Sequence, residues 1–463
     1  MTIQKPSVPT GTRDYSPGVM VRRNFIFRTI ENVFRLYGYQ PIETPAMEYL
    51  STLMGKYGEE GDKLLFRILN SGNFLTAAEN LDIRTEDPAK VASVFCEKGL
   101  RYDLTVPFAR YVVQHRNEIT LPFRRYQIQP VWRADKPQKG RYREFYQCDV
   151  DIVGSDSLLN ERELIEIIIE TFSKLKVNCL IKINNRKILG GIAEYMGEQG
   201  RMNDITACMD KLERTGREQV ISELLSRGIS REAAGRLEPL LDIRGSNFSK
   251  TEYLESLLKG SSTGMQGITE IRQLLELVDG LGYDRQIEFD LRLARGLDYY
   301  TGTIIEVLAK DENIGSICGG GRYDDLTGIF GMQGLSGVGI SFGADRIYDV
   351  MNRLDIFPPG AVSSTDLLFV NFGGQQQKYI FDLAAALRKE GIITELYPDQ
   401  AKIKKQLDYA NRKNIPYVAL VGEEEIAGGK VTLKNMTSGE QKKLSIGQVI
   451  GEVKNRDKDH LGS

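Results

Sequence analysis

A stretch of about one hundred residues, 186–284, has a helical character and lies between segments that are patterned as strands. It is charged, punctuated by glycine and without a convincing strand pattern. The segment before it, VNCLIKIN (177–184), and the segment after it, QIEFDLRLA (286–294), both read as strands. We therefore expect a helical module of residues 186–284, inserted into one sheet domain that residues 1–185 and 285–356 form together.

The predicted sheet domain has its longest strand signal in residues 121–154, LPFRRYQIQPVWRADKPQKGRYREFYQCDVDIVG. Two strand-like runs flank a polar loop centred on residues 137–140, which predicts an antiparallel hairpin with a long basic tip. A helix is predicted over 21–37, and further strands are predicted in TGTIIEVLA (301–309) and SGVGISFGADRIYDVM (336–351). Sequential antiparallel strands with few helices favour an α+β domain over a doubly wound one.

The pattern changes again after residues 357–365, FPPGAVSST, which have the composition of a linker. Beyond this linker, strand-like and helix-like segments alternate as β-α-β-α-β from DLLFVNF to YVALVG. Such alternation implies parallel pairing of the strands. We expect a separate small α/β domain at residues 366–455.

The composition excludes several classes of protein. The formal net charge is −2 over 463 residues, so a nucleic-acid site would have to be local. Five cysteines without CxxC spacing and only two histidines argue against a disulfide framework, a zinc cluster and a Ser/His triad. No apolar run is long enough to span a membrane, and the first residues lack an apolar core, so we expect a cytoplasmic protein.

The tip of the predicted hairpin concentrates positive charge between aromatic side chains. The cations are Arg133, Lys136, Lys139, Arg141 and Arg143. Such a run is often only a solvated loop. However, the strand that leaves the loop carries Gln147, Asp149 and Asp151 at alternate positions, which places all three on one face. Cations at one end of this face and carboxylates at the other could hold a phosphate together with an amine-like ligand.

Three other segments give weaker signals. SICGGGRYDDL (316–326) matches neither the dinucleotide nor the P-loop spacing and is predicted to be a structural turn, although its glycines would let the backbone approach a ligand. Arg346 stands at the start of a predicted helix, where an ordinary surface arginine is equally compatible. Asp103, Thr105 and Arg110 fit a surface salt-bridge cluster when taken alone.

The conjunction and order of these segments carry more information than any one of them. The early helix and strand ending at Pro45, the hairpin VWRADKPQKGRYREFYQCDVDIVG and GVGISFGADRI resemble motifs one, two and three of the class II aminoacyl-tRNA synthetases. LARGLDYYTGTIIEV (293–307) and CGGGRYDDL (318–326) look like the two signature segments of the histidyl-tRNA synthetases. GTRDYSP (11–17) supports the same resemblance, which runs from about residue 9 into the C-terminal domain.

Two alternatives share parts of this pattern. A regulatory subunit of histidine biosynthesis keeps the catalytic fold, but such relatives usually lack the C-terminal domain and lose the RGLDYY segment. Both features are intact in this sequence. A class II synthetase for threonine, proline or glycine shares the type of anticodon-binding domain, and the paired histidine-specific segments speak against it.

The resemblance implies an antiparallel-sheet class II catalytic domain with a helical insertion, followed by a small α/β anticodon-binding domain. It implies ATP-dependent ligation of L-histidine to tRNA(His) through a histidyl-adenylate, with release of AMP and pyrophosphate. The implied partners are ATP with Mg²⁺, L-histidine, tRNA(His) and a second copy of the chain, because residues 21–50 match the motif of the class II dimer interface. Neither a membrane nor a metal bound by side chains is implied.

The resemblance also implies roles for single residues. Arg133 would hold the α-phosphate, Arg346 would meet the γ-phosphate, and Arg295 would add positive charge at the α-phosphate. The expected ATP-binding residues are Arg133, Asp135, Arg141 and Arg346. The expected histidine-binding residues are Asp103, Thr105, Gln147, Asp151, Arg295, Tyr299, Tyr300 and Tyr323. The expected contacts to the tRNA acceptor end are Lys136, Gln138 and Lys139. Asp135 and Asp151 are shorter than the glutamates that are common at these positions.

Overall fold

The computed structural model describes residues 5–54, 64–78, 86–138, 140–283, 286–294, 300–358, 361, 363–374 and 376–461. The chain divides into two compact units, one of residues 1–13 and 26–353 and the other of residues 14–25 and 354–463. Each unit is described by itself below. Within the described ranges, no helix is both long enough and apolar enough to cross a membrane.

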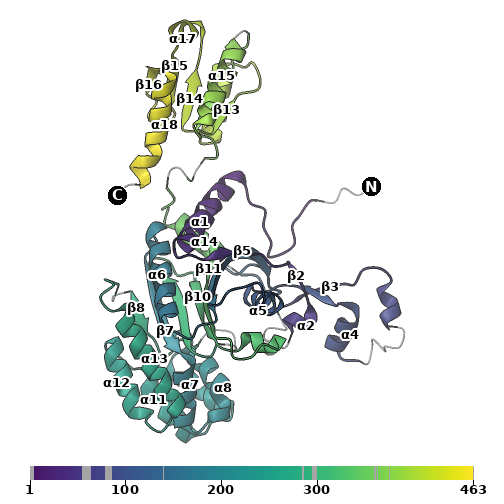
Figure 1. The fold of residues 1–463 in the computed structure, drawn as a ribbon, viewed down its shortest axis with the longest axis vertical. Coiled ribbons are helices and arrows are strands. Elements are labelled where there is room, and N and C mark those ends of the chain that lie inside the picture. Colours follow the sequence, from purple (N-terminus) through teal and green to yellow (C-terminus); the bar gives the residue numbers. More distant parts are fainter. Residues whose placement is uncertain are drawn as a thin grey trace. The chain divides into compact units, whose positions relative to one another are not determined.

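The first unit is built on an eight-stranded sheet (Figure 1). In spatial order its strands are β1 (Gln40–Pro41), β5 (Phe123–Trp132), β6 (Glu144–Val153), β11 (Gly337–Gly343), β10 (Ser316–Tyr323), β9 (Thr303–Ala309), β7 (Cys179–Asn185) and β8 (Ile287–Phe289). The inner strands pair antiparallel, and only the outer pairs β1–β5 and β7–β8 are parallel. The predicted α+β class and the predicted hairpin are confirmed.

One face of this sheet packs against helices. Phe342 of β11 meets Phe34 of α1 (Pro17–Leu36) at 5.8 Å between ring centroids, and it meets Phe172 of α6 (Leu159–Lys174) at 5.6 Å. Because side chains alternate along a strand, the neighbours of Phe342 on β11 point to the opposite face. That opposite face carries the polar residues of the predicted site. α14 (Ala344–Arg353) follows β11 directly, as the sequence predicts.

A smaller antiparallel sheet of β2 (Met47–Tyr49), β4 (Lys98–Leu100) and β3 (Phe66–Ile68) lies in the same unit. The short helices beside it are α2 (Leu50–Leu53), η1 (Phe74–Ala78), α4 (Pro88–Phe95) and α5 (Thr105–Gln114). Arg101, which follows β4, is fully buried and donates to the carbonyls of Thr44 (2.6 Å) and Pro130 (3.1 Å). This guanidinium ties the start of the 101–110 segment to the large sheet, so Asp103 and Thr105 have fixed positions beside it.

The described residues between β7 and β8 form helices and their connecting turns, without a strand. They are α7 (Arg186–Met196), η2 (Gln199–Arg201), α8 (Met202–Met209), α9 (Leu212–Thr215), α10 (Arg217–Ser226), α11 (Arg231–Leu241), α12 (Asn247–Leu257) and α13 (Ser262–Val278). α7 and α13 pack so closely that a Cβ at Gly267 would overlap the backbone of Ile188. Figure 1 shows these helices gathered beside β7 and β8. The exact bounds 186–284 of an insertion stay a prediction.

The second unit contains a five-stranded sheet in the order β13 (Thr394–Leu396), β12 (Leu367–Phe369), β14 (Tyr417–Leu420), β15 (Val431–Asn435) and β16 (Gln441–Leu444). β12 pairs parallel with β13 and with β14, which confirms the predicted pairing. The two antiparallel strands β15 and β16 were not foreseen in the sequence. The helices are α15 (Gln376–Lys389), α16 (Ile403–Arg412), α17 (Glu423–Gly428) and α18 (Ile446–Leu461).

Two local predictions are wrong. Residues 316–323 form the inner strand β10 and not a turn. Glycine is required there because the neighbouring strands leave no room, and a Cβ at Gly320 would overlap the carbonyl oxygen of Gly339. Strand β8 also ends at Phe289, earlier than the alternation suggests, because the next residue, Asp290, turns into a buried ion pair with Lys182 (2.8 Å).

Candidate active site

The open face of the large sheet carries a polar floor built from strand register. Residues directly opposite one another in neighbouring strands share a face. Across β5, β6, β11 and β10, one row is Arg125, Asp151, Gly339 and Gly321, and the next row is Gln127, Asp149, Ser341 and Gly319. Charged and amide groups therefore occupy β5 and β6, while β11 and β10 contribute small residues that leave space above the sheet.

A cavity of about 170 Å³ lies on this floor. It is lined by Asp103, Thr105, Arg133, Gln147, Asp149, Asp151, Tyr300, Gly319, Gly320, Tyr323, Gly339, Ile340 and Ser341. At one end, Asp151 accepts a hydrogen bond from the Tyr323 hydroxyl (2.6 Å) and forms an ion pair with the fully buried Arg125 (2.8 Å). Arg125 also stacks over the ring of Phe108 at 4.1 Å. This cluster gives the cavity a fixed polar end.

Two glycines of β11 make room for this polar end. A Cβ at Gly339 would overlap the Asp151 carboxylate, and a Cβ at Gly337 would overlap the Tyr323 ring. Neither position has the left-handed backbone that also favours glycine, so close approach alone explains them. The glycines in GVGISFG thus have a steric role that the sequence pattern did not reveal.

Burial changes the acidity of the groups around the cavity. It raises the pKa of Asp151, and Arg125 and the Tyr323 hydroxyl oppose the rise. It raises the pKa of Asp149 to about 7, with Arg125 opposing and Asp151 adding to the effect. Burial and the nearby Asp151 raise the pKa of Tyr323 well above its usual value, so this phenol remains a hydrogen-bond donor. Perturbed carboxylates that line a cavity are a common mark of a functional site.

A second cavity, of about 470 Å³, adjoins the first. The two share Arg133, Gln147, Gly319 and Ser341 in their linings. The second cavity is also lined by Arg141 and Arg346 and by the hairpin residues Asp135 and Gln138. Three guanidinium groups therefore border one space, and Arg133 lies where that space meets the smaller cavity.

The arginines of the larger cavity are held in place by hydrogen bonds. Arg346 donates to the carbonyl of Gly140 (2.9 Å) and to that of Ser316 (2.7 Å). Arg133 donates to the carbonyl of Tyr102 (2.9 Å), and Arg141 pairs with Asp135 (2.7 Å). Guanidinium groups fixed in this way lose little freedom when a phosphate binds.

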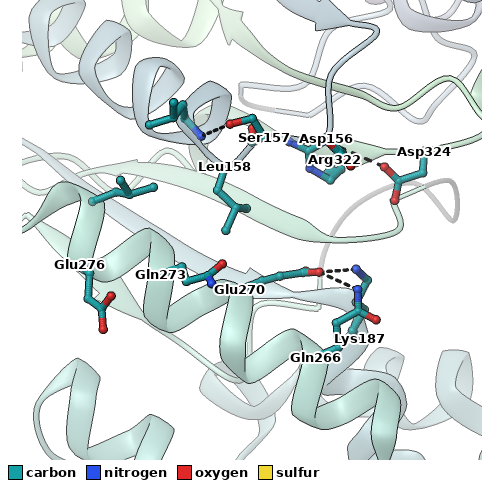
Figure 2. A pocket seen from close by; sticks show the side chains of 12 residues that line it. Asp156, Ser157, Leu158, Lys187, Gln266, Glu270, Gln273, Glu276, Arg322 and Asp324 are labelled. Carbon is teal, nitrogen blue, oxygen red and sulfur yellow. Dashed lines mark hydrogen bonds and ion pairs between the residues drawn. The ribbon is translucent and has the colours of Figure 1, made fainter.

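A more voluminous cavity, of about 830 Å³, lies elsewhere in the unit (Figure 2). Figure 2 shows the 156–158 loop facing α13, with Glu270 bound by Lys187 and Arg322 beside Asp324. Its buried cation, Arg322, is bound to Glu161 through two hydrogen bonds of 2.6 Å. Both cations of this lining are already paired, Lys187 with Glu270 and Arg322 with Glu161, so the two adjoining cavities are the better candidate for binding a phosphate.

The family model described as histidyl-tRNA synthetase matches residues 97–347, more than half of the chain. The chain belongs to the histidyl-tRNA synthetase family. Histidine–tRNA ligase activity comes with this membership. A second family model, an anticodon-binding domain, matches residues 366–456. A synthetase for threonine, proline or glycine is thereby excluded.

The similarity to curated relatives extends over nearly the whole chain of this synthetase. The histidine–tRNA ligase of Phocaeicola vulgatus is 58% identical over 450 residues, which span 97% of this chain and 99% of that protein. The histidine–tRNA ligase of Porphyromonas gingivalis is 58% identical over 442 residues, 96% of this chain and 97% of that protein.

Solved structures show the same fold. A histidyl-tRNA synthetase from Nostoc superposes with a TM-score of 0.83 at 29% identity, over 98% of this chain and 100% of that chain. A Bacillus halodurans protein described as an ATP phosphoribosyltransferase regulatory subunit/histidyl-tRNA synthetase reaches a TM-score of 0.71 at 21% identity, over 90% of this chain and 100% of that chain. At 21% identity, the second likeness shows only that the folds are similar. It does not support a function as a regulatory subunit.

The structure brings most of the residues predicted for this synthetase together. The two cavities are lined by Asp103, Thr105, Arg133, Asp135, Gln138, Arg141, Gln147, Asp151, Tyr300, Tyr323 and Arg346. Asp103 and Thr105 are buried and not part of a surface cluster, whereas Arg110 pairs with Glu48 (2.8 Å) away from the cavities. Lys136 is exposed in the hairpin loop and lines neither cavity. The predictions for Lys139, Arg295 and Tyr299 lie outside the described residues.

Several residues of the site had no role in the sequence analysis. Arg125 and Ser341 were not singled out, and Asp149 was noted only as part of a polar face. The signal for Arg125 was present, because Arg125, Gln127 and Gln129 alternate along β5 as the polar residues of β6 do. Only the register, which sets Arg125 opposite Asp151, shows that the two polar faces coincide.

Proposed function

We propose that the two adjoining cavities carry out the first step of the ligase reaction, attack of the histidine carboxylate on the α-phosphate of ATP. The supporting observation is that the smaller, acid-bearing cavity and the larger, arginine-bordered cavity share Arg133 and Gln147. A carboxylate in one and a phosphate in the other would meet at these residues. Aligning two reactants in this way can supply much of the rate enhancement.

The larger cavity would hold ATP. Its arginines would neutralise the triphosphate, with Arg133 at the α-phosphate and Arg346 at the γ-phosphate, while Arg141 and Asp135 would border the nucleotide. Arg295 would add charge at the α-phosphate, and this role rests on the resemblance of its segment. Because phosphoryl transfer needs mainly positioning and charge stabilisation, no side-chain base is required.

Mg²⁺ would come with the nucleotide. Within the described ranges, no group of three or more His, Cys, Asp or Glu side chains could hold a metal ion. Among the described residues, two carboxylates line the larger cavity, Asp135 and Asp345, and they are paired with Arg141 and Arg13. The phosphate oxygens of ATP and water would therefore supply most ligands of the ion, as Mg²⁺ commonly prefers.

The smaller cavity would hold histidine. Asp103 and Thr105 would take the α-amino group, Gln147 would lie at the carboxylate end, and Tyr300 and Tyr323 would enclose the imidazole, with Tyr299 and Arg295 assigned from the resemblance. Asp151 would belong to the imidazole end, where it holds the Tyr323 hydroxyl. A pocket whose polar groups need a ring N–H rejects an apolar ligand of the same shape by about 10⁴-fold, because its own groups would be left unpaired.

The tRNA(His) would be bound at two places. Lys136, Gln138 and Lys139 of the hairpin loop would approach its acceptor end, and residues 366–455 would read the anticodon as splayed single-stranded bases. We place this reaction in the cytoplasm, in protein synthesis.

Amino-acid-dependent ATP–pyrophosphate exchange with each of the twenty amino acids tests the proposed reaction. We expect exchange with histidine and none above background with the other nineteen. Exchange driven by another amino acid would show a different specificity. The absence of exchange with any amino acid would show that the cavities do not form an adenylate.

We also expect the protein to be a homodimer. Residues 21–50, which include most of α1 and the strands β1 and β2, correspond to the class II motif that forms the dimer interface. Light scattering at micromolar concentration should therefore give about twice the 52.1 kDa mass of one chain. A mass of one chain under these conditions would contradict the assignment of this segment.

A further inference from the structure

The N-terminal segment of residues 9–13 lies against the base of the hairpin that carries arginines of the larger cavity. The carbonyl of Gly11 accepts the backbone N–H of Arg143 (2.9 Å). A Cβ at Gly11 would overlap the side chains of Pro137 and Arg143, and the φ of +89° at Gly11 also favours glycine. The segment therefore fits closely onto the hairpin, at a point where the chain needs glycine.

Arg13, at the end of this segment, contacts two side chains of the larger cavity. Its guanidinium forms an ion pair with Asp345, the second residue of α14, and it stacks over the ring of Tyr142 at 3.3 Å. Both Asp345 and Tyr142 line the larger cavity, whereas Arg13 lines neither cavity. Arg13 can therefore act on the cavity only through these two neighbours.

The two partners of Arg13 are the chain neighbours of arginines that border the same cavity. Tyr142 follows Arg141 in the hairpin. Asp345 precedes Arg346 in α14. Arg13 thus links the hairpin to α14 at the two places where each of them presents a guanidinium group to the cavity.

The charge of Asp345 needs compensation if the larger cavity holds a triphosphate. The carboxylate is buried in the wall of that cavity, and its ion pair with Arg13 supplies the compensation. Without Arg13, the carboxylate would repel the phosphates and compete with them for the guanidinium groups of the cavity. Because charges in a partly buried site are weakly screened, one uncompensated carboxylate can weaken the binding of an anion about 10- to 100-fold.

We propose that Arg13 is a positioning residue of the ATP site. By compensating the charge of Asp345 and stacking on Tyr142, it keeps the hairpin and α14 in the arrangement that binds the triphosphate. The guanidinium groups of Arg141 and Arg346 then meet the phosphates and not the Asp345 carboxylate. This inference rests on the proposed function of the larger cavity as the ATP site. It gives the N-terminal segment a role in substrate binding.

Arg13→Met removes the positive charge but keeps a long side chain over Tyr142. We expect KM for ATP in histidine-dependent pyrophosphate exchange to rise about 10- to 100-fold, while KM for histidine stays near wild type. A general loss of stability would not separate the two KM values in this way. Arg13→Lys restores a positive charge and should recover most of the loss. A wild-type KM for ATP in Arg13→Met would overturn the proposal.

A double variant tests whether the charge of Asp345 causes the loss. Asp345 accepts the backbone N–H of Tyr146 (3.0 Å), and the amide oxygen of Asp345→Asn can accept the same bond without a charge. Arg13→Met combined with Asp345→Asn should therefore have a clearly lower KM for ATP than Arg13→Met alone. If the double variant had the same KM for ATP as Arg13→Met, the compensation of charge would be refuted and the proposal with it.

Arg353→Ala is the matched control on the same helix. Arg353 lies in the last turn of α14, pairs with Glu312 (2.9 Å) and lines neither cavity. Its loss should leave KM for ATP near wild type. An equal rise in Arg353→Ala and Arg13→Met would overturn the proposal, because the loss of any ion pair of α14 would then be sufficient.

A direct binding measurement separates this inference from the proposed reaction. Titration calorimetry with ATP and Mg²⁺, in the absence of histidine, should show that Arg13→Met binds ATP more weakly by the same factor. Equal affinity in wild type and Arg13→Met would overturn the role of Arg13. Wild-type enzyme that binds ATP in this way but shows no histidine-dependent exchange would refute only the proposed reaction.

Discussion

Replacing Arg295 with alanine should lower the rate of adenylate formation about 10²- to 10³-fold, the usual effect of removing one preorganised charge stabiliser. The α-phosphate gains negative charge as the carboxylate attacks, and the resemblance of LARGLDYYTGTIIEV assigns Arg295 to that position. Pyrophosphate exchange at saturating histidine and ATP measures the loss. The melting temperature should stay at the wild-type value, because the expected contact is to substrate.

Arg292→Ala is the matched control for Arg295→Ala. Arg292 lies three positions earlier, is partly exposed and binds Asp290 through two nitrogens, at 2.8 and 3.0 Å. Asp290 keeps Lys182 as a partner (2.8 Å) in that variant, so we expect near-normal exchange. Wild-type exchange in Arg295→Ala would remove this arginine from the mechanism. An equal loss in both variants would point to a general effect of charge in this segment.

Replacing Arg322 with alanine should destabilise the first unit by about 3–5 kcal/mol, the cost typical of breaking a buried ion pair from one side. Arg322 binds Glu161 through two hydrogen bonds of 2.6 Å, and Glu161 is fully buried. Without the guanidinium, the carboxylate is left in the interior without its counter-charge. Urea and thermal unfolding, followed by a signal from the first unit, should show an earlier transition than wild type.

A double variant separates two causes of the lost stability, the unpaired buried charge and the lost packing. Arg322→Met with Glu161→Leu removes both charges at similar volume, so it should be clearly more stable than Arg322→Ala. Recovery should be incomplete, because Arg322 also donates to the Ser155 carbonyl (3.2 Å) and to the Ser336 hydroxyl (2.6 Å). A double variant as unstable as Arg322→Ala would show that packing, and not the ion pair, dominates.

The sequence predicted the parts of the fold that depend on local pattern. Alternation and turn residues gave the hairpin of β5 and β6, and the β-α-β-α-β pattern gave the parallel strands of the second unit. The glycine run 316–323 was wrongly predicted as a turn, because glycine in a strand and glycine in a turn look alike in one sequence. What decides between them is the crowding by β9 and β11, which is a property of the assembled sheet.

Some residues of the candidate site could be predicted from the sequence, and others could not. The arginines of the larger cavity and the polar face of β6 could be found, because they lie in segments that resemble a known family. The place of Arg125 in the site could not be found in the sequence. It depends on Asp151, which becomes the neighbour of Arg125 only through strand register.

The parallel pairing of β7 with β8 sets Ile181 beside Ile287, although the intervening chain holds all the helices from α7 to α13. This helical segment thus takes the place of an ordinary crossover between adjacent parallel strands, which needs only about a dozen residues. The entropic cost of closing a loop grows slowly, by about 0.6 kcal/mol for each doubling of its length. A change in the length of this crossover should therefore cost little loop-closure entropy, so the register of the strands that line the two cavities need not depend on that length.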